Sequence, residues 1–220
     1  MSRYDVSPAG TRSVLAARLH ESAGTPRTDD AARDLLLKGV RDVVASFIAA
    51  PPEPAADGAI VIRADEPEHL LDLVRHISDA VRPEHATFGL AVATGHPAVG
   101  SLDRAVVGAD AVTTAALTAL LATGLRNARV AILAPGRQPL LESLISLMLE
   151  FTDRMTERQR QIISLVRSSE TQQQVAQHLG VSRQAVNQSL TSAGWQHIRR
   201  AEDTARDALA VLARERALES

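Results

Sequence analysis

The first half of the chain alternates between two spacings of apolar residues. Short apolar runs bounded by polar or turn-forming residues are typical of buried strands: Ala59–Ala64, Ala86–Thr94 and Ala128–Pro135. Helical spacing occurs in the segments between and before them: Ser13–Leu19, Ala31–Ala50, Glu66–Val81 and Ser101–Gly124. The proline-rich run from Pro51 to Gly58 is expected to form neither regular element. Together these patterns predict a sheet covered by helices.

The segment from Gln138 to Phe151 is apolar around most of a helical circumference. Its apolar residues are Leu140, Leu141, Leu144, Ile145, Leu147, Met148, Leu149 and Phe151. A helix of this kind is expected to be buried on more than one side. Packing between domains and contact with a second copy of the chain both satisfy this expectation.

The last third of the chain has the start and stop signals of consecutive helices. Capping boxes begin two of them, at Thr156 with Gln159 and at Thr171 with Gln174. Gly180 then stands where a left-handed residue commonly ends a helix, and Ser182 can cap the next one. This order predicts a supporting helix over 156–168 and a helix-turn-helix over 171–192. A long helix is expected from Trp195 to about Arg216.

Burial within the helix-turn-helix follows from the same spacing. The residues expected to face inward are Val175, Ala176, Leu179, Ala185, Val186, Ser189 and Leu190. The residues expected to face outward on the second helix are Arg183, Gln184, Asn187, Gln188 and Thr191. Asn and Gln amides can form paired hydrogen bonds with adenine, and Arg can contact guanine or phosphate. We therefore expect Ser182–Ser192 to bind double-stranded DNA in the major groove. A hairpin used only for packing is the alternative.

Charge is unevenly distributed in a chain whose net charge is −2. Residues 1–153 carry a net −5, residues 154–200 a net +5, and residues 201–220 a net −2. The positive segment coincides with the helix-turn-helix, as contact with phosphate requires. Further candidate phosphate contacts are Arg154, Arg158, Arg160, Arg199 and Arg200.

Composition narrows the class of protein. A chain of 220 residues suits one large or two small domains. The sequence has no Cys, no apolar run long enough to span a bilayer and no secretory signal, so we expect a cytoplasmic protein with no membrane partner. Only five residues are aromatic, which disfavours base stacking on single strands. Arg outnumbers Lys 23 to 1, which suggests a GC-rich bacterial genome.

The chain resembles, over most of its length, the SatD-like family, bacterial proteins that pair an α/β domain with a helix-turn-helix. The clearest match runs from "TERQRQIISLV" through "VAQHLGVSRQAVNQSLTSAGW", and "YDVS", "IRADEPEHLL" and "FGLAVATG" are weaker upstream matches. The DNA-binding part is also similar to region 4 of sigma factors and to LuxR-type domains. These resemblances imply an α+β fold. We expect an α/β domain at 1–136, a connecting helix at 137–153 and a helix-turn-helix domain with a long last helix at 154–220.

The α/β half is loosely similar to the nucleotide-cyclase palm, a divergent ferredoxin-like sandwich that holds metals on two Asp residues. Asp5 and Asp65, with Glu66, match by position, and their oxygens would suit Mg²⁺. A turn or helix-start role explains them better, and no phosphate-binding glycine loop is present in the sequence. The histidines lack metal-ligand spacing: His69, His76, His85 and His96. We expect no catalytic residue, no metal site and no cofactor.

These observations predict a sequence-specific DNA-binding protein of bacterial transcription. Because one helix-turn-helix contacts few base pairs, we expect a homodimer, assembled through the apolar helix or the last helix. The α/β domain would serve dimerisation or the sensing of a small molecule or nucleotide. Two alternatives remain: an adaptor that binds protein such as RNA polymerase, and a degenerate cyclase-like enzyme with an attached DNA reader.

Overall fold

The computed structural model describes residues 12–19, 28–41, 51–64, 66–93, 104–126, 128–134, 136–168 and 170–214. The chain divides into two compact units. The first unit comprises Met1–Ser146 and Ala205–Ser220, and the second comprises Leu147–Thr204. Both divisions fall inside helices.

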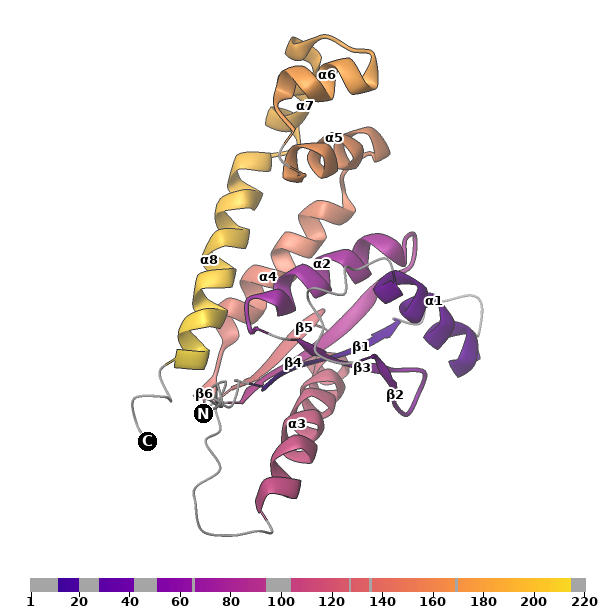
Figure 1. The fold of residues 1–220 in the computed structure, drawn as a ribbon, viewed down its shortest axis with the longest axis vertical. Helices are drawn as coiled ribbons and strands as arrows, with labels where there is room; N and C mark the ends of the chain where they lie inside the picture. Colours follow the sequence, from indigo (N-terminus) through magenta and orange to yellow (C-terminus); the bar gives the residue numbers. More distant parts are fainter. Residues whose placement is uncertain are drawn as a thin grey trace, which may run out of the picture. The chain divides into compact units, whose positions relative to one another are not determined.

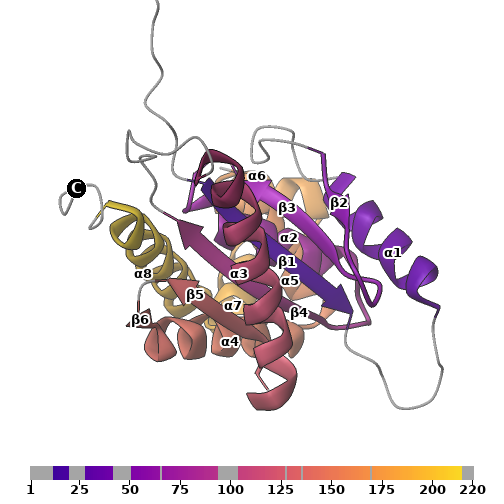
Figure 2. The same ribbon diagram turned by 90° about the horizontal axis from the view of Figure 1, so that it is seen from below.

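The first unit is built on a mixed six-stranded sheet with the order β2-β3-β1-β4-β5-β6 (Figure 2). The strands are β1 (Arg12–Leu19), β2 (Glu53–Pro54), β3 (Ile60–Ala64), β4 (Ala86–Ala93), β5 (Val130–Ala134) and β6 (Gly136–Arg137). β1 lies between β3 and β4 and is antiparallel to both. The β4–β5 pair is parallel, because helix α3 carries the chain between these two strands.

Two expectations about this sheet were wrong. The segment Ser13–Leu19 forms strand β1 rather than a helix. Residues 13–17 are all buried, as expected of a central strand that is covered on both faces. A short strand of this kind has no polar alternation, so its apolar spacing does not distinguish it from a helix. The proline-rich run contains the short strand β2, and Pro54 is tolerated there because β2 lies at the edge of the sheet.

Helices cover both faces of the sheet (Figure 1). Those of the first unit are α1 (Asp29–Arg41), α2 (His69–Ala80), α3 (Arg104–Arg126) and the start of α4 (Pro139–Asp153). α1 and α2 pack together on one face, and α3 packs on β1, β4 and β5 from the other. α3 approaches β4 closely at Gly89, where an added Cβ would lie 2.1 Å from the carbonyl oxygen of Ala116.

The described residues of the second unit form helices and the turns between them. It contains the end of α4, the whole of α5 (Glu157–Arg167), α6 (Gln172–Leu179) and α7 (Arg183–Ser192), and the start of α8 (Trp195–Arg214). Its core consists of Met155, Ile162, Ile163, Val175, Ala176, Val186, Leu190, Ala193, Trp195 and Ile198. An α/β unit followed by an all-α unit confirms the expected α+β class.

Helix α4 is buried on one side within the single chain, so the expected burial on more than one side stays a prediction. Leu141, Ile145, Met148 and Leu149 are buried. The opposite side is open: Leu140 is 86% exposed, Leu147 55% and Phe151 51%. We call these three residues the α4 stripe. No helix in the described part of the chain is long and apolar enough to cross a membrane.

Candidate nucleic-acid interface

Local capping groups fix both ends of α6. The Thr171 hydroxyl accepts a hydrogen bond from the backbone N–H of Gln174, and the Gln174 side chain accepts one from the backbone N–H of Thr171. Gly180 closes the helix with a φ of 65°, a conformation that suits glycine. The N–H of Val181 donates back to the carbonyl of Ala176 at 2.9 Å, so the chain turns sharply before α7.

Helix α7 begins at Ser182, whose hydroxyl accepts from the backbone N–H of Ala185 at 3.1 Å. Val186 and Leu190 are buried, and Ser189 is half-buried. The exposed residues are Arg183, Gln184, Ala185, Asn187, Gln188, Thr191 and Ser192. The helix therefore rests on a narrow seam and exposes most of its circumference.

Ala185 was expected to face inward, and that expectation was wrong. An α-helix turns by about 100° per residue, so the seam of Val186 and Leu190 fixes the direction of every other side chain. Gln188 then lies opposite the seam, and Gln184 lies about 40° to one side of Gln188. Ala185 lies about 60° to the other side of Gln188, on the outward face.

Helix α5 holds the other two helices in place. The Arg158 guanidinium donates to the carbonyl of Leu179 at 3.2 Å, at the end of α6. The Gln159 amide donates to the Ser192 hydroxyl at 3.2 Å, at the end of α7. Gln159 also completes the capping box with Thr156. Side chains from one turn of α5 therefore reach both helices of the helix-turn-helix.

The candidate phosphate contacts fall into two groups. Arg158 and Arg160 have partners within the unit, since Arg160 pairs with Glu157 at 2.6 Å and also donates to the carbonyl of Met155. Arg154 is 78% exposed and lies 3.8 Å from Glu150, while Arg199 and Arg200 are exposed on α8. The guanidinium groups of Arg158 and Arg160 are engaged within the unit, whereas Arg199 and Arg200 have the surface position that phosphate contact requires.

A cluster that the sequence did not reveal joins α5 to α8. The Arg167 guanidinium lies 4.8 Å from the centroid of the Trp195 ring and forms an ion pair with Glu202. The side chains of Arg167 and Glu202 are 18% and 11% exposed. Residues 35 apart in the chain leave no local signal of such a pair, although Glu202 falls on the apolar side of α8, four residues after Ile198.

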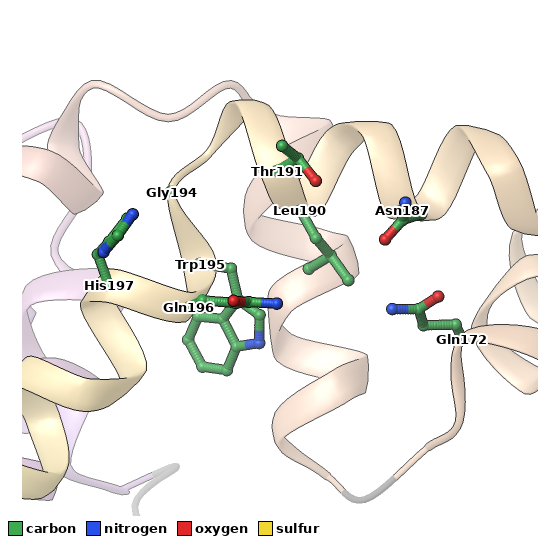
Figure 3. A pocket seen from close by; sticks show the side chains of 8 residues that line it. All are labelled: Gln172, Asn187, Leu190, Thr191, Gly194, Trp195, Gln196 and His197. Atoms are coloured by element: carbon green, nitrogen blue, oxygen red, sulfur yellow. The ribbon is translucent and has the colours of Figure 1, made fainter.

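A hollow of about 210 Å³ lies beside α7 (Figure 3). Its lining comes from α6, α7 and the start of α8: Gln172, Asn187, Leu190, Thr191, Gly194, Trp195, Gln196 and His197. Figure 3 shows the Gln172 side chain extending from α6 towards Asn187. Asn187 thus borders this hollow, whereas Gln184 and Gln188 lie nearer the middle of the outward face.

The candidate metal ligands do not come together in the described part of the chain, where no group of three or more His, Asp or Glu residues could hold an ion. Asp5, Asp65 and His96 lie outside the described residues. Glu66 is exposed ahead of α2. His76 is half-buried with Nδ1 2.7 Å from the carbonyl oxygen of Asp72, and burial lowers the pKa of its imidazole, with the nearby charge of Arg75 acting in the same direction.

Residues 153–193 match the family model described as sigma-70, region 4. The match extends from the last residue of α4 through α5, α6 and α7. No curated protein matches the chain, and no solved structure does. The resemblance to SatD-like proteins therefore remains a prediction, whereas the resemblance to sigma-factor region 4 is confirmed for this segment. Residues 153–193 are thus similar to sigma-70 region 4, a helix-turn-helix DNA-binding module associated with transcription.

Proposed function

We propose that this protein is a sequence-specific double-stranded DNA-binding regulator of transcription that inserts α7 into the major groove. The observation that carries the proposal is the outward face of α7 within the sigma-70 region 4 match. Gln184 and Gln188 lie at the middle of this face, on a helix whose buried residues are Val186 and Leu190. Amide side chains in this position suit paired hydrogen bonds with adenine.

The remaining candidate residues have supporting roles in this proposal. Arg183 in the first turn contacts a guanine or a phosphate, and Asn187 and Thr191 contact bases at the side of the face that borders the hollow. Arg154, Arg199 and Arg200 contact phosphates, which fixes the position of the protein on DNA without specifying sequence. Arg158 and Arg160 hold the unit together, as their hydrogen bonds within it indicate. Ser182 caps α7 at the groove.

A homodimer completes the proposal. Two helix-turn-helix units across a two-fold axis read two half-sites, which raises specificity above what one unit provides. The α4 stripe supports this assembly, because a monomer rarely leaves large apolar side chains such as Leu140 in water along one helix. Leu147 and Phe151 follow it at seven and eleven residues, close to the spacing of a two-helix seam. The α/β unit then serves dimerisation, or responds to a small-molecule or nucleotide effector in the cytoplasm.

The test is selection of bound duplexes from sheared genomic DNA. The intact protein is compared with a Gln184→Ala/Gln188→Ala variant and with Gln177→Ala, which makes the same change at an exposed position of α6. We expect the intact protein and Gln177→Ala to enrich the same sequence, and the Gln184→Ala/Gln188→Ala variant to enrich no sequence. If all three proteins enrich nothing, the regulator proposal fails.

The α4 stripe also favours a second candidate, an adaptor that binds protein partners such as RNA polymerase. An exposed apolar stripe suits a protein contact whether the partner is a second copy or another chain. A partner whose capture survives nuclease and the Gln184→Ala/Gln188→Ala change, but is lost in Leu140→Glu, would support the adaptor. We propose no catalytic role for the α/β unit.

A further inference from the structure

Ala185 is the one exposed apolar residue on α7. Every other exposed side chain of that helix ends in an amide, a guanidinium or a hydroxyl. Its position is fixed, because its backbone N–H donates to the Ser182 hydroxyl at 3.1 Å in the first turn of the helix. A methyl group without rotamers is therefore held rigidly on the face proposed to enter the major groove.

The neighbours of Ala185 are the two proposed adenine readers. Gln184 precedes it in the chain, and Gln188 follows three residues later, one turn along the same surface. The first turns of a recognition helix are the part that contacts base edges. Ala185 thus lies where a base edge would approach, beside amides that suit adenine.

The major groove offers one apolar group at a base edge, the C5-methyl of thymine. An alanine methyl can pack against it, and it provides no hydrogen bond to any other base pair. A polar or charged residue at 185 would keep water at that point of the contact. Ala185 therefore offers an apolar contact, which the hydrogen-bonding side chains around it do not supply.

We propose that Ala185 reads a thymine C5-methyl next to an adenine read by Gln184 or Gln188. This inference rests on the proposed DNA-binding function, and it adds the base that the amides do not specify. The half-site then contains a thymine whose methyl group is required for full affinity, next to the adenine that an amide reads. Thr191 carries the other methyl group on the outward face, about 60° from Gln188 on the opposite side, and it is the competing reader.

The experiment replaces each thymine of the selected duplex by uracil, one at a time, which removes only the methyl group. Binding is measured for the intact protein, Ala185→Gly and Thr191→Ser, the last of which keeps the hydroxyl and loses the methyl. We expect one uracil to weaken binding of the intact protein about fourfold, the equivalent of one methyl group removed from a contact. Ala185→Gly should lose that penalty, and Thr191→Ser should keep it.

Ala201→Gly controls for the lower helix propensity of glycine, because it makes the same change in α8 away from the proposed base contacts. Ala185→Ser provides a second variant if Ala185→Gly does not fold, and it should also reduce the uracil penalty. A scan without a sensitive thymine overturns the inference, and so does a penalty that persists in the Ala185 variants or disappears in Thr191→Ser. If binding is selective but no uracil weakens it, the Ala185 inference fails and the regulator proposal stands. If binding is not selective, both the Ala185 inference and the regulator proposal fail.

Discussion

The guanidinium of Arg167 lies over the ring of Trp195, 4.8 Å from its centroid, in the second unit. Trp195 is the first residue of α8, and Arg167 is the last residue of α5. Glu202, about two turns further along α8, forms an ion pair with the same guanidinium. The three side chains fix the start of α8 against the end of α5, and α5 in turn holds α6 and α7 through Arg158 and Gln159.

This relationship predicts that Glu202→Gln destabilises the second unit. The change leaves the largely buried Arg167 charge without its carboxylate, which costs about 3 kcal/mol in the free energy of unfolding. Urea unfolding followed by circular dichroism measures the loss. Glu150→Gln is the control, because its pair with Arg154 is exposed and should cost less than about 1 kcal/mol. Equal losses in the two variants would show that the Arg167–Glu202 pair is not a stabilising contact.

Gly89 predicts a sharper effect in the first unit. Gly89→Ala places a Cβ against the backbone of α3, where the nearest carbonyl oxygen would lie 2.1 Å away. Backbone cannot yield as a side-chain tip can, so we expect a loss of about 3 kcal/mol or more in stability. Gly124→Ala in α3 has nothing within 4 Å and should be neutral or stabilising by up to about 1 kcal/mol. Thermal unfolding that ranks the two variants alike would contradict the packing of α3 on β4.

The exposed arginines of α8 predict a salt dependence. Arg199→Ala and Arg200→Ala should each weaken binding to every duplex alike and reduce the slope of log K against log salt by about 0.9. Arg63→Ala, on β3 of the first unit, removes the same charge away from the proposed interface and should leave the slope unchanged. Fluorescence anisotropy across a salt series measures all three. A slope unaffected by the α8 variants would remove Arg199 and Arg200 from the interface.

The α4 stripe predicts the state of assembly. We expect a dimer at micromolar concentration in light scattering, and Leu140→Glu should raise its dissociation constant about tenfold or more, because a buried Leu is worth about 1.5–3 kcal/mol. Leu121→Glu is the matched control, since Leu121 is 58% exposed on α3. A monomeric intact protein, or dissociation caused equally by both changes, would exclude the α4 stripe as the contact.

Local signals account for what the sequence predicted well. The capping boxes at Thr156 and Thr171 and the left-handed Gly180 act within a few residues, and the structure confirms all three. Val175 and Val186 were also correctly assigned to the core, because helical spacing alone separates them from their polar neighbours.

Expectations failed where tertiary neighbours decide. β1 was taken for a helix because burial on both faces removes the alternation that identifies a strand. The apolar residues of α4 do not indicate which side of the helix packs within the chain, so the exposure of Leu140 could not be predicted. Ala185 is too small for its type to indicate a side, and only the narrow seam of α7 shows that it faces outward. The Arg167–Glu202 pair depends on the packing of α5 against α8.

The most direct test of the account is the specificity ratio of α7. The dissociation constants for a selected duplex and for a scrambled duplex are measured at one salt concentration for the intact protein, Gln184→Ala/Gln188→Ala and Gln177→Ala. We expect a ratio of at least about 1,000 for the intact protein and for Gln177→Ala, and a fall of tenfold or more in the double variant. An unchanged ratio in the double variant would contradict the claim that these amides read bases.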